Sequence, residues 1–263
     1  MIVLEAVSKY FHRGGVNEVL ALDRIDLTIE RGDFVTVIGS NGAGKSTLLN
    51  CLAGTYPHDS GRLTVDGTDI GQWPEHRRAR FIGRVFQNPL TGTCASLSIE
   101  QNLALAMKRG ASRGLGIGVK TKDRRFVLEK LAFLGLGLEE RLKAGVGLLS
   151  GGQRQALTMI MATLVQPEIL LLDEHTAALD PKTALQIMEL TRKIVQEQAL
   201  TTLMVTHNMR QALAFGNRLI MMHRGRIIAD IAADEKDTLR VEDLLARFYD
   251  TGEAAASDRM LLV

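Results

Sequence analysis

Nine consecutive residues near position 40 have the types and spacing that bind phosphate groups. Glycines let consecutive backbone N–H groups turn toward phosphate oxygens, and a helix that begins within the loop adds its positive end. In the pattern G-x-x-x-x-G-K-S, Lys45 would reach the β- and γ-phosphates and Ser46 would offer its hydroxyl to Mg²⁺. Thr47 would bond the α-phosphate. The alternative is a glycine-rich turn without a ligand. The loop comprises Gly39, Ser40, Asn41, Gly42, Ala43, Gly44, Lys45, Ser46 and Thr47.

Two carboxylates follow the apolar run 169–172, whose composition predicts a buried strand. Asp173 would stand at the carboxyl edge of the sheet, beside the phosphate loop, and hold a Mg²⁺-bound water. Glu174 is the candidate that polarises the attacking water. The alternative is that both carboxylates only cap the helix that follows. The intact phosphate loop favours the catalytic interpretation.

Three further polar sites accompany these motifs. Gln87 lies between the phosphate loop and the carboxylates, and a solvated loop glutamine is its alternative. His207 ends the apolar run 203–205, where a structural histidine is the alternative. A second glycine-rich turn at 149–153 precedes a helix expected to start near Gln153, so its amides would form another anion site. This turn contains Ser150, Gly151, Gly152 and Gln153.

In their order, these motifs resemble those of the ATP-binding subunit of ABC transporters over nearly the whole chain. The resemblance implies hydrolysis of ATP to ADP and phosphate with Mg²⁺. It implies that His207 contacts the γ-phosphate and that Gln87 touches Mg²⁺ or the attacking water. It also implies an ATP-dependent, head-to-tail homodimer, in which the turn at Ser150 completes the ATP pocket of the opposite subunit.

The same resemblance predicts that an early aromatic residue stacks on adenine. The spacing favours Phe11, with Tyr10 as the alternative, and either ring could instead belong to the core. The run after Glu174 departs from the common family pattern, because His175 replaces a proline and Ala177 replaces a serine. Asp180 is retained and is expected at the dimer interface. This stretch is similar to a subgroup of bacterial importer ATPases that are often paired with binding proteins of the tryptophan/tyrosine type.

The composition limits the classes of partner that this chain is expected to bind. The 263 residues carry a formal net charge of +2, which gives no argument for nucleic acid as a partner. The two cysteines lack metal-ligand spacing and are expected to be reduced thiols. No apolar run approaches the roughly 18 to 20 residues that span a bilayer, and the first residues lack a secretory signal. Together with these observations, the resemblance to ABC transporters implies a peripheral subunit at the cytoplasmic face of the membrane. It would bind separate integral membrane permease subunits and act indirectly with an extracytoplasmic substrate-binding protein.

The pattern of elements predicts an α/β fold: a P-loop NTPase (RecA-like) core with an antiparallel β edge and an inserted helical lobe. Buried strands are expected at 34–38, 169–172 and 203–205, and antiparallel strands in the first thirty residues. Helices are expected at 46–53, 98–108, 123–134, 181–197 and 208–215. We predict an ATP-binding core at 1–87 and 154–250, a helical lobe with the second glycine turn at 88–153, a glycine-rich surface loop at 109–119 and a loosely ordered tail at 251–263.

Two other functions share parts of this pattern. A non-transport ABC ATPase of translation, repair or cluster assembly would carry the same motifs, although no second ATPase domain or long coiled coil is evident. A P-loop kinase for a small molecule would lack the turn at 149–153 and His207. The cargo of a transporter cannot be predicted, because all these motifs act on nucleotide.

Overall fold

The structure is a computed structural model, and it describes residues 1–111 and 121–249. The glycine-rich part of the expected loop at 109–119 and the expected tail at 251–263 lie outside the described residues. The chain divides into two compact units, one formed by Met1–Arg78 with Thr201–Val263 and the other by Ala79–Leu200. The expected helical lobe, 88–153, falls inside the second unit, and its finer boundaries remain a prediction.

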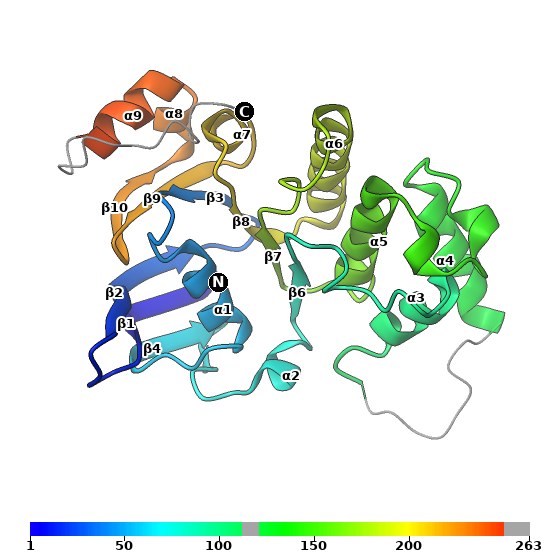
Figure 1. The fold of residues 1–263 in the computed structure, drawn as a ribbon, viewed down its shortest axis with the longest axis horizontal. Helices are drawn as coiled ribbons and strands as arrows, with labels where there is room; N and C mark the ends of the chain where they lie inside the picture. The colour runs from blue at the N-terminus through cyan, green and yellow to red at the C-terminus, as the bar shows by residue number, and fades with distance from the viewer. Residues whose placement is uncertain (112–120, 250–263) are drawn as a thin grey trace. The chain divides into compact units, whose positions relative to one another are not determined.

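An antiparallel sheet of four strands forms one part of the first unit (Figure 1). Strand β1 is central and pairs with β2 and β4, so that Ile2 lies opposite both Ile29 and Val65. This sheet confirms the antiparallel strands expected in the first thirty residues. In spatial order it contains β2 (Val19–Ile29), β1 (Ile2–Phe11), β4 (Ser60–Val65) and β5 (Thr68–Asp69).

A second set of strands in this unit supports the phosphate loop. Strand β3 (Phe34–Gly39) is wholly buried and lies parallel to β8 (Thr201–Val205) and β9 (Arg218–His223), as its unbroken apolar sequence predicts. Strand β10 (Arg226–Ile231) forms an antiparallel hairpin with β9. The helices are α1 (Lys45–Ala53), α2 (Glu75–Arg78), α7 (Met209–Ala214), α8 (Ala233–Lys236) and α9 (Val241–Tyr249).

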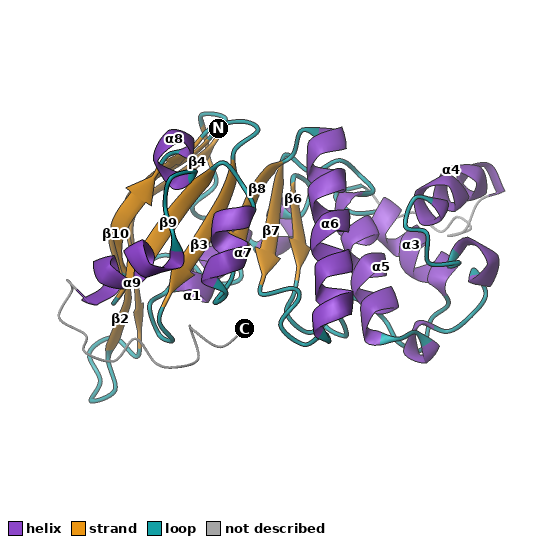
Figure 2. Cartoon of the chain, turned by 90° about the horizontal axis from the view of Figure 1, so that it is seen from above, coloured by secondary structure: helices purple, strands orange, loops and turns teal. Residues whose placement is uncertain are grey.

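Helices α7 and α9 share one core with these strands (Figure 2). Ile38 of β3 and Leu219 of β9 are buried against Met209 of α7 and Phe248 of α9. The packing of α7 also fixes the turn that precedes it, which carries His207.

The second unit contains two paired parallel strands and four α-helices among its described residues. Strand β6 (Ile82–Val85) runs beside β7 (Ile169–Asp173), and α5 packs against both α3 and α6. Between 88 and 149, the described residues form helices and 3-10 turns with one isolated bridge, from Ser98 to Gly145, as expected. The helices are α3 (Ile99–Met107), α4 (Thr121–Ala132), α5 (Gly151–Thr163) and α6 (Pro181–Gln198), with 3-10 turns at Glu139–Arg141 and Val146–Leu148.

Local sequence explains where these helices begin. Ser98 and Ser150 each form a capping box with the glutamine three residues later, and Asp180 caps α6 with Pro181 at its first position. Helix α5 therefore starts at Gly151, two residues before the expected start at Gln153. The sequence pattern predicts a later start because glycine is a poor helix former.

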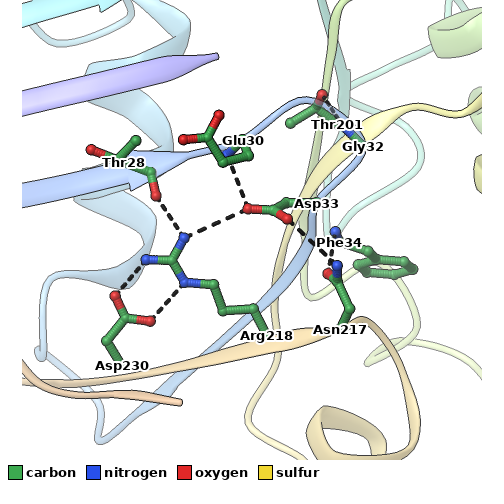
Figure 3. A network of polar contacts seen from close by, with 9 residues as sticks. All are labelled: Thr28, Glu30, Gly32, Asp33, Phe34, Thr201, Asn217, Arg218 and Asp230. Atoms are coloured by element: carbon green, nitrogen blue, oxygen red, sulfur yellow. Dashed lines mark hydrogen bonds and ion pairs between the residues drawn. The ribbon is translucent and has the colours of Figure 1, made fainter. Parts of the chain in front are cut away.

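Arg218 joins the strands of the first unit at the amino end of β3 (Figure 3). Its guanidinium donates two hydrogen bonds to Asp230 of β10 and one to the carbonyl of Thr28 in β2. It also forms an ion pair with Asp33 at 3.6 Å. Asn217 accepts a bond from the N–H of Phe34 and donates one to Asp33. One side chain thus fixes β2, β9, β10 and the start of β3.

Neither spanning helices nor a disulfide is found in the part of the chain that the structure describes. No helix there is long and apolar enough to cross a bilayer. Cys51 is a buried thiol in α1, and burial raises its pKa to about 11. Cys94 is exposed, and neither cysteine forms a disulfide bond.

Replacing Arg218 with methionine should destabilise the first unit by about 2 kcal/mol, because two carboxylates and one carbonyl lose a charged donor together. Urea unfolding measures the change. The matched control is Arg62→Met, which removes one exposed contact to Asp69 and should cost less than about 0.5 kcal/mol. Equal losses in the two variants would contradict the central role of Arg218.

Candidate active site

The phosphate loop follows β3 directly. The strand ends at Gly39 and α1 begins at Lys45, so the loop occupies the turn between them. Gly44 has a positive φ of 99°, and a Cβ added there would lie 2.5 Å from the carbonyl oxygen of Ala21. A Cβ on Gly39 would lie 2.4 Å from the carbonyl oxygen of Met222. Glycine is therefore required at both ends of the loop.

Lys45 carries the positive charge of this loop. Its residue is only 6% exposed, and its ammonium donates to the carbonyl oxygens of Gly39 at 2.7 Å and Ser40 at 3.0 Å. Ser46 is exposed and Thr47 is half-buried at the first turn of α1. The loop therefore presents a helix N-terminus, a hydroxyl and a fixed cation to an anionic ligand.

His207 lies at the same edge of the strands as the phosphate loop. Strands β3 and β8 are parallel neighbours with Val37 opposite Val205, so the segments that follow them leave the same edge. His207 is half-buried in the turn between β8 and α7. Thr206 accepts a bond from the N–H of Asn208, which in turn caps α7. The turn is thus fixed on both sides of the histidine.

The structure also brings together Gln87, Asp173 and Glu174. Strands β6 and β7 are parallel, with Val85 opposite Leu172, so both chains leave the sheet at the same end. The Nε2 of Gln87 donates a hydrogen bond to Oε2 of Glu174 at 3.1 Å. Asp173 is the last residue of β7. The glutamine and the two carboxylates therefore form one polar cluster in the second unit.

Arg84 belongs to this cluster, although sequence reasoning did not identify it. Its Nη2 lies 3.5 Å from Oδ2 of Asp173, and its guanidinium stacks 4.5 Å above the ring of Phe86. The side chains of Arg84 and Asp173 are 12% and 16% exposed, so water screens their attraction weakly. The sequence feature that could have identified Arg84 is its place as the single cation in the otherwise apolar run 82–86.

His175 is buried beside Glu174. Burial lowers its pKa to about 4, so its ring is neutral near pH 7. The Nε2 atom lies 3.1 Å from Oγ1 of Thr191 in α6. The contact joins the turn after β7 to a helix, and no local sequence pattern predicts it because 16 residues separate His175 from Thr191.

The second glycine turn forms the start of α5. The hydroxyl oxygen of Ser150 accepts from the N–H of Gln153, and Gln153 Oε1 accepts from the N–H of Ser150. Gly151 and Gly152 occupy the first two helical positions. A Cβ on Gly152 would lie 2.3 Å from Cγ2 of Thr183, so a methyl group there would press on α6. The Ser150 hydroxyl retains its hydrogen as a donor to an anion.

The aromatic candidates already contact neighbouring side chains. Phe11 is the last residue of β1, and its ring meets Tyr56 edge to face with centroids 5.3 Å apart. The Lys9 ammonium lies 5.7 Å from the same ring. The ring of Tyr10 lies under the guanidinium of Arg13 at 4.9 Å. Both Phe11 and Tyr10 are half-buried, so stacking on adenine remains a prediction for either ring.

Comparison with known proteins identifies the family. The family model described as ABC transporter matches residues 22–177. The chain belongs to the ABC transporter family. It is 44% identical to a tyrosine transport ATP-binding protein of Clostridioides difficile (strain R20291), over 94% of this chain and 98% of that protein. It is 36% identical to the phosphonates import ATP-binding protein PhnC of Frankia casuarinae, over 96% and 97% of the two chains.

Solved structures of similar proteins support the assignment of this chain to the ABC transporter family. A dimeric ATP-binding cassette in a post-hydrolysis state with ADP and Pi superimposes with a TM-score of 0.75 at 30% identity, over 89% of this chain and 99% of that chain. A further cassette in its ADP conformation gives a TM-score of 0.77 at 26% identity, over 96% and 99%. The chain is the ATP-hydrolysing subunit of an ABC transporter, and its core is the expected P-loop NTPase fold.

Proposed function

We propose that this chain drives a bacterial importer, and that the residues described in its two units act in one reaction, the hydrolysis of Mg²⁺–ATP. The observation that carries the proposal is the pairing of Gln87 with Glu174 at the end of β7, in a chain that also holds a complete phosphate loop. The importer names of its relatives support the direction of transport.

In the first unit, the loop from Gly39 to Thr47 would bind the phosphates. Its amides cradle the oxygens, and the Lys45 ammonium would exchange its two carbonyl partners for the β- and γ-phosphates. The Thr47 hydroxyl would bond the α-phosphate. His207 would contact the γ-phosphate, and Phe11 or Tyr10 would stack on adenine.

We expect three side chains to hold Mg²⁺. They are the Ser46 hydroxyl, the Asp173 carboxylate through a water, and the Gln87 amide oxygen, all of them hard oxygen ligands. Among the described residues, no three His, Cys, Asp or Glu side chains gather into a metal site. In nucleotide sites Mg²⁺ usually shares its coordination between phosphates and few carboxylates, so we expect the ion to enter with the nucleotide. When bound, the ion neutralises phosphate charge.

Glu174 would orient the attacking water. Its Oε2 accepts a hydrogen bond from Gln87, which fixes the carboxylate, and the carboxylate would then accept a proton from water. Movement of Gln87 toward Mg²⁺ or the water would then change the orientation of Glu174, so the state of the nucleotide would reach the helices that follow Gln87.

The second glycine turn would act on the ATP of the opposite subunit. Ser150, Gly151 and Gly152 form the N-terminus of a 13-residue helix, and Gln153 stabilises it through the capping box. A helix N-terminus of this kind binds anions. The dimeric cassettes among the structural neighbours support a homodimer, and we propose that its subunits are arranged head to tail.

Replacing Glu174 with glutamine should leave ATP binding intact and reduce hydrolysis on the order of 100-fold or more, because the water loses its base. Release of phosphate measures the rate of ATP turnover. Light scattering measures the mass of the particle in solution and so distinguishes monomer from dimer. The variant should accumulate as an ATP-bound dimer. Turnover near that of the wild type would remove Glu174 from this role.

The matched control adds Ser150→Arg to Glu174→Gln. The arginine would occupy the site of the partner's γ-phosphate, so the dimer should disappear while the monomer binds ATP normally. Loss of ATP affinity in the isolated monomer would place Ser150 in its own subunit's site and contradict the head-to-tail arrangement.

The proposed partners are permease subunits in the membrane, with this chain at the cytoplasmic face, and a substrate-binding protein on the other side. The similarity to a tyrosine transport protein favours an aromatic amino acid as cargo. A tagged chain purified from detergent-solubilised membranes should retain a multi-span protein. The binding protein encoded with it should bind tyrosine or tryptophan in calorimetry, with glutamate as the control ligand. Recovery with ribosomes or DNA instead would favour a non-transport ABC ATPase.

A further inference from the structure

The turn after β7 holds Glu174 in an uncommon backbone conformation. Its φ is +44°, in the left-handed region that non-glycine residues rarely adopt. Such a conformation is unfavourable and persists only where surrounding contacts fix it. One contact is the hydrogen bond from the N–H of Ala177 to the carbonyl of Glu174, at 3.0 Å. The direction of the Glu174 carboxylate therefore depends on what fixes this turn.

The His175 side chain supplies a second anchor. Its residue is 2% exposed, and its Nε2 lies 3.1 Å from Oγ1 of Thr191, which is itself fully buried. Thr191 lies in the third turn of α6, a helix of 18 residues that also packs on α5. The contact thus ties the residue next to Glu174 to a rigid element.

The direction of this hydrogen bond follows from the threonine. The Thr191 hydroxyl has one hydrogen, and it donates that hydrogen to the carbonyl oxygen of Ile187 at 2.8 Å. The hydroxyl can therefore only accept from His175, so the ring is the tautomer protonated at Nε2. The contact is a chain of two buried bonds, from imidazole to hydroxyl to helix carbonyl. Loss of the acceptor would leave a buried donor unpaired, which proteins avoid.

We propose that His175 is a positioning residue for the ATPase reaction: its hydrogen bond to Thr191 fixes the turn that aims the Glu174 carboxylate at the attacking water. The proposal rests on the catalytic role proposed for Glu174. Gln87 holds the carboxylate from the side of β6, and His175 holds the backbone from the side of α6. A proline at position 175 could restrict the turn through its ring but could not donate this bond.

The test compares Thr191→Val with Thr191→Ser. Valine keeps the size of threonine and removes the acceptor, whereas serine retains the hydroxyl. Steady-state ATPase assays should show a kcat about tenfold lower for valine, because small misplacement of a catalytic group is costly, and an unchanged KM for ATP. Serine should keep kcat within about twofold of the wild type. Equal kcat values for valine and the wild type in folded proteins would overturn the proposal.

Combining Thr191→Val with Glu174→Gln distinguishes a positioning role of His175 from a general loss of structure. In single-turnover assays, Thr191→Val should not slow hydrolysis further once Glu174→Gln is present, because no base remains to be positioned. A further tenfold loss in that background would overturn the proposal. If Glu174→Gln alone hydrolyses ATP normally, the catalytic role of Glu174 fails, whatever Thr191→Val does.

A second pair of variants, both at His175, tests the proposal if Thr191→Val does not fold. His175→Gln places an amide N–H near the position of Nε2, whereas His175→Leu fills similar space without a donor. The glutamine variant should retain a kcat at least fivefold above that of the leucine variant. Equal kcat values for the two variants would overturn the proposal.

Discussion

The hydrogen bonds between the Lys45 ammonium and the carbonyl oxygens of Gly39 and Ser40 organise the phosphate loop. A buried cation is costly unless polar groups surround it, and here the backbone of the loop itself provides them. The loop can close around the lysine because Gly44 adopts a positive φ and Gly39 passes close to Met222. Strand β3 before the loop is buried and α1 after it buries most of its residues, so the cation and the helix N-terminus are held in position.

The second unit uses side-chain pairs to place its carboxylates. Asp173 meets Arg84, and Glu174 meets Gln87, in both cases across the parallel pair β6 and β7. The register of two strands thus fixes two carboxylates with different partners. Asp173 faces the cation Arg84, whereas Glu174 accepts a hydrogen bond from a neutral amide. This difference matches the separate roles proposed for them, one toward the metal and one toward the nucleophile.

Local patterns predicted much of this arrangement. The apolar run before Gly39 and the glycine spacing sufficed for the phosphate loop, because strand, turn and helix are adjacent in sequence. Residues whose partners lie far along the chain were missed. Arg78 is fully buried and donates to the carbonyls of Cys51 and Gly71, and Thr191 accepts from His175, yet neither follows a period or motif. Such contacts depend on packing between elements, which a single sequence does not specify.

The positive charge of Lys45 is central to nucleotide binding, and the affinity of the isolated chain for ATP tests its role most directly. Lys45→Met should weaken ATP binding at least about tenfold in calorimetry, a loss of about 1.4 kcal/mol, since a triphosphate would meet the loop without its cation. The exposed Lys193→Met serves as the control and should bind as the wild type does. A thermal melt must show both variants folded. Unchanged ATP affinity in folded Lys45→Met protein would contradict the assignment of this loop as the phosphate site.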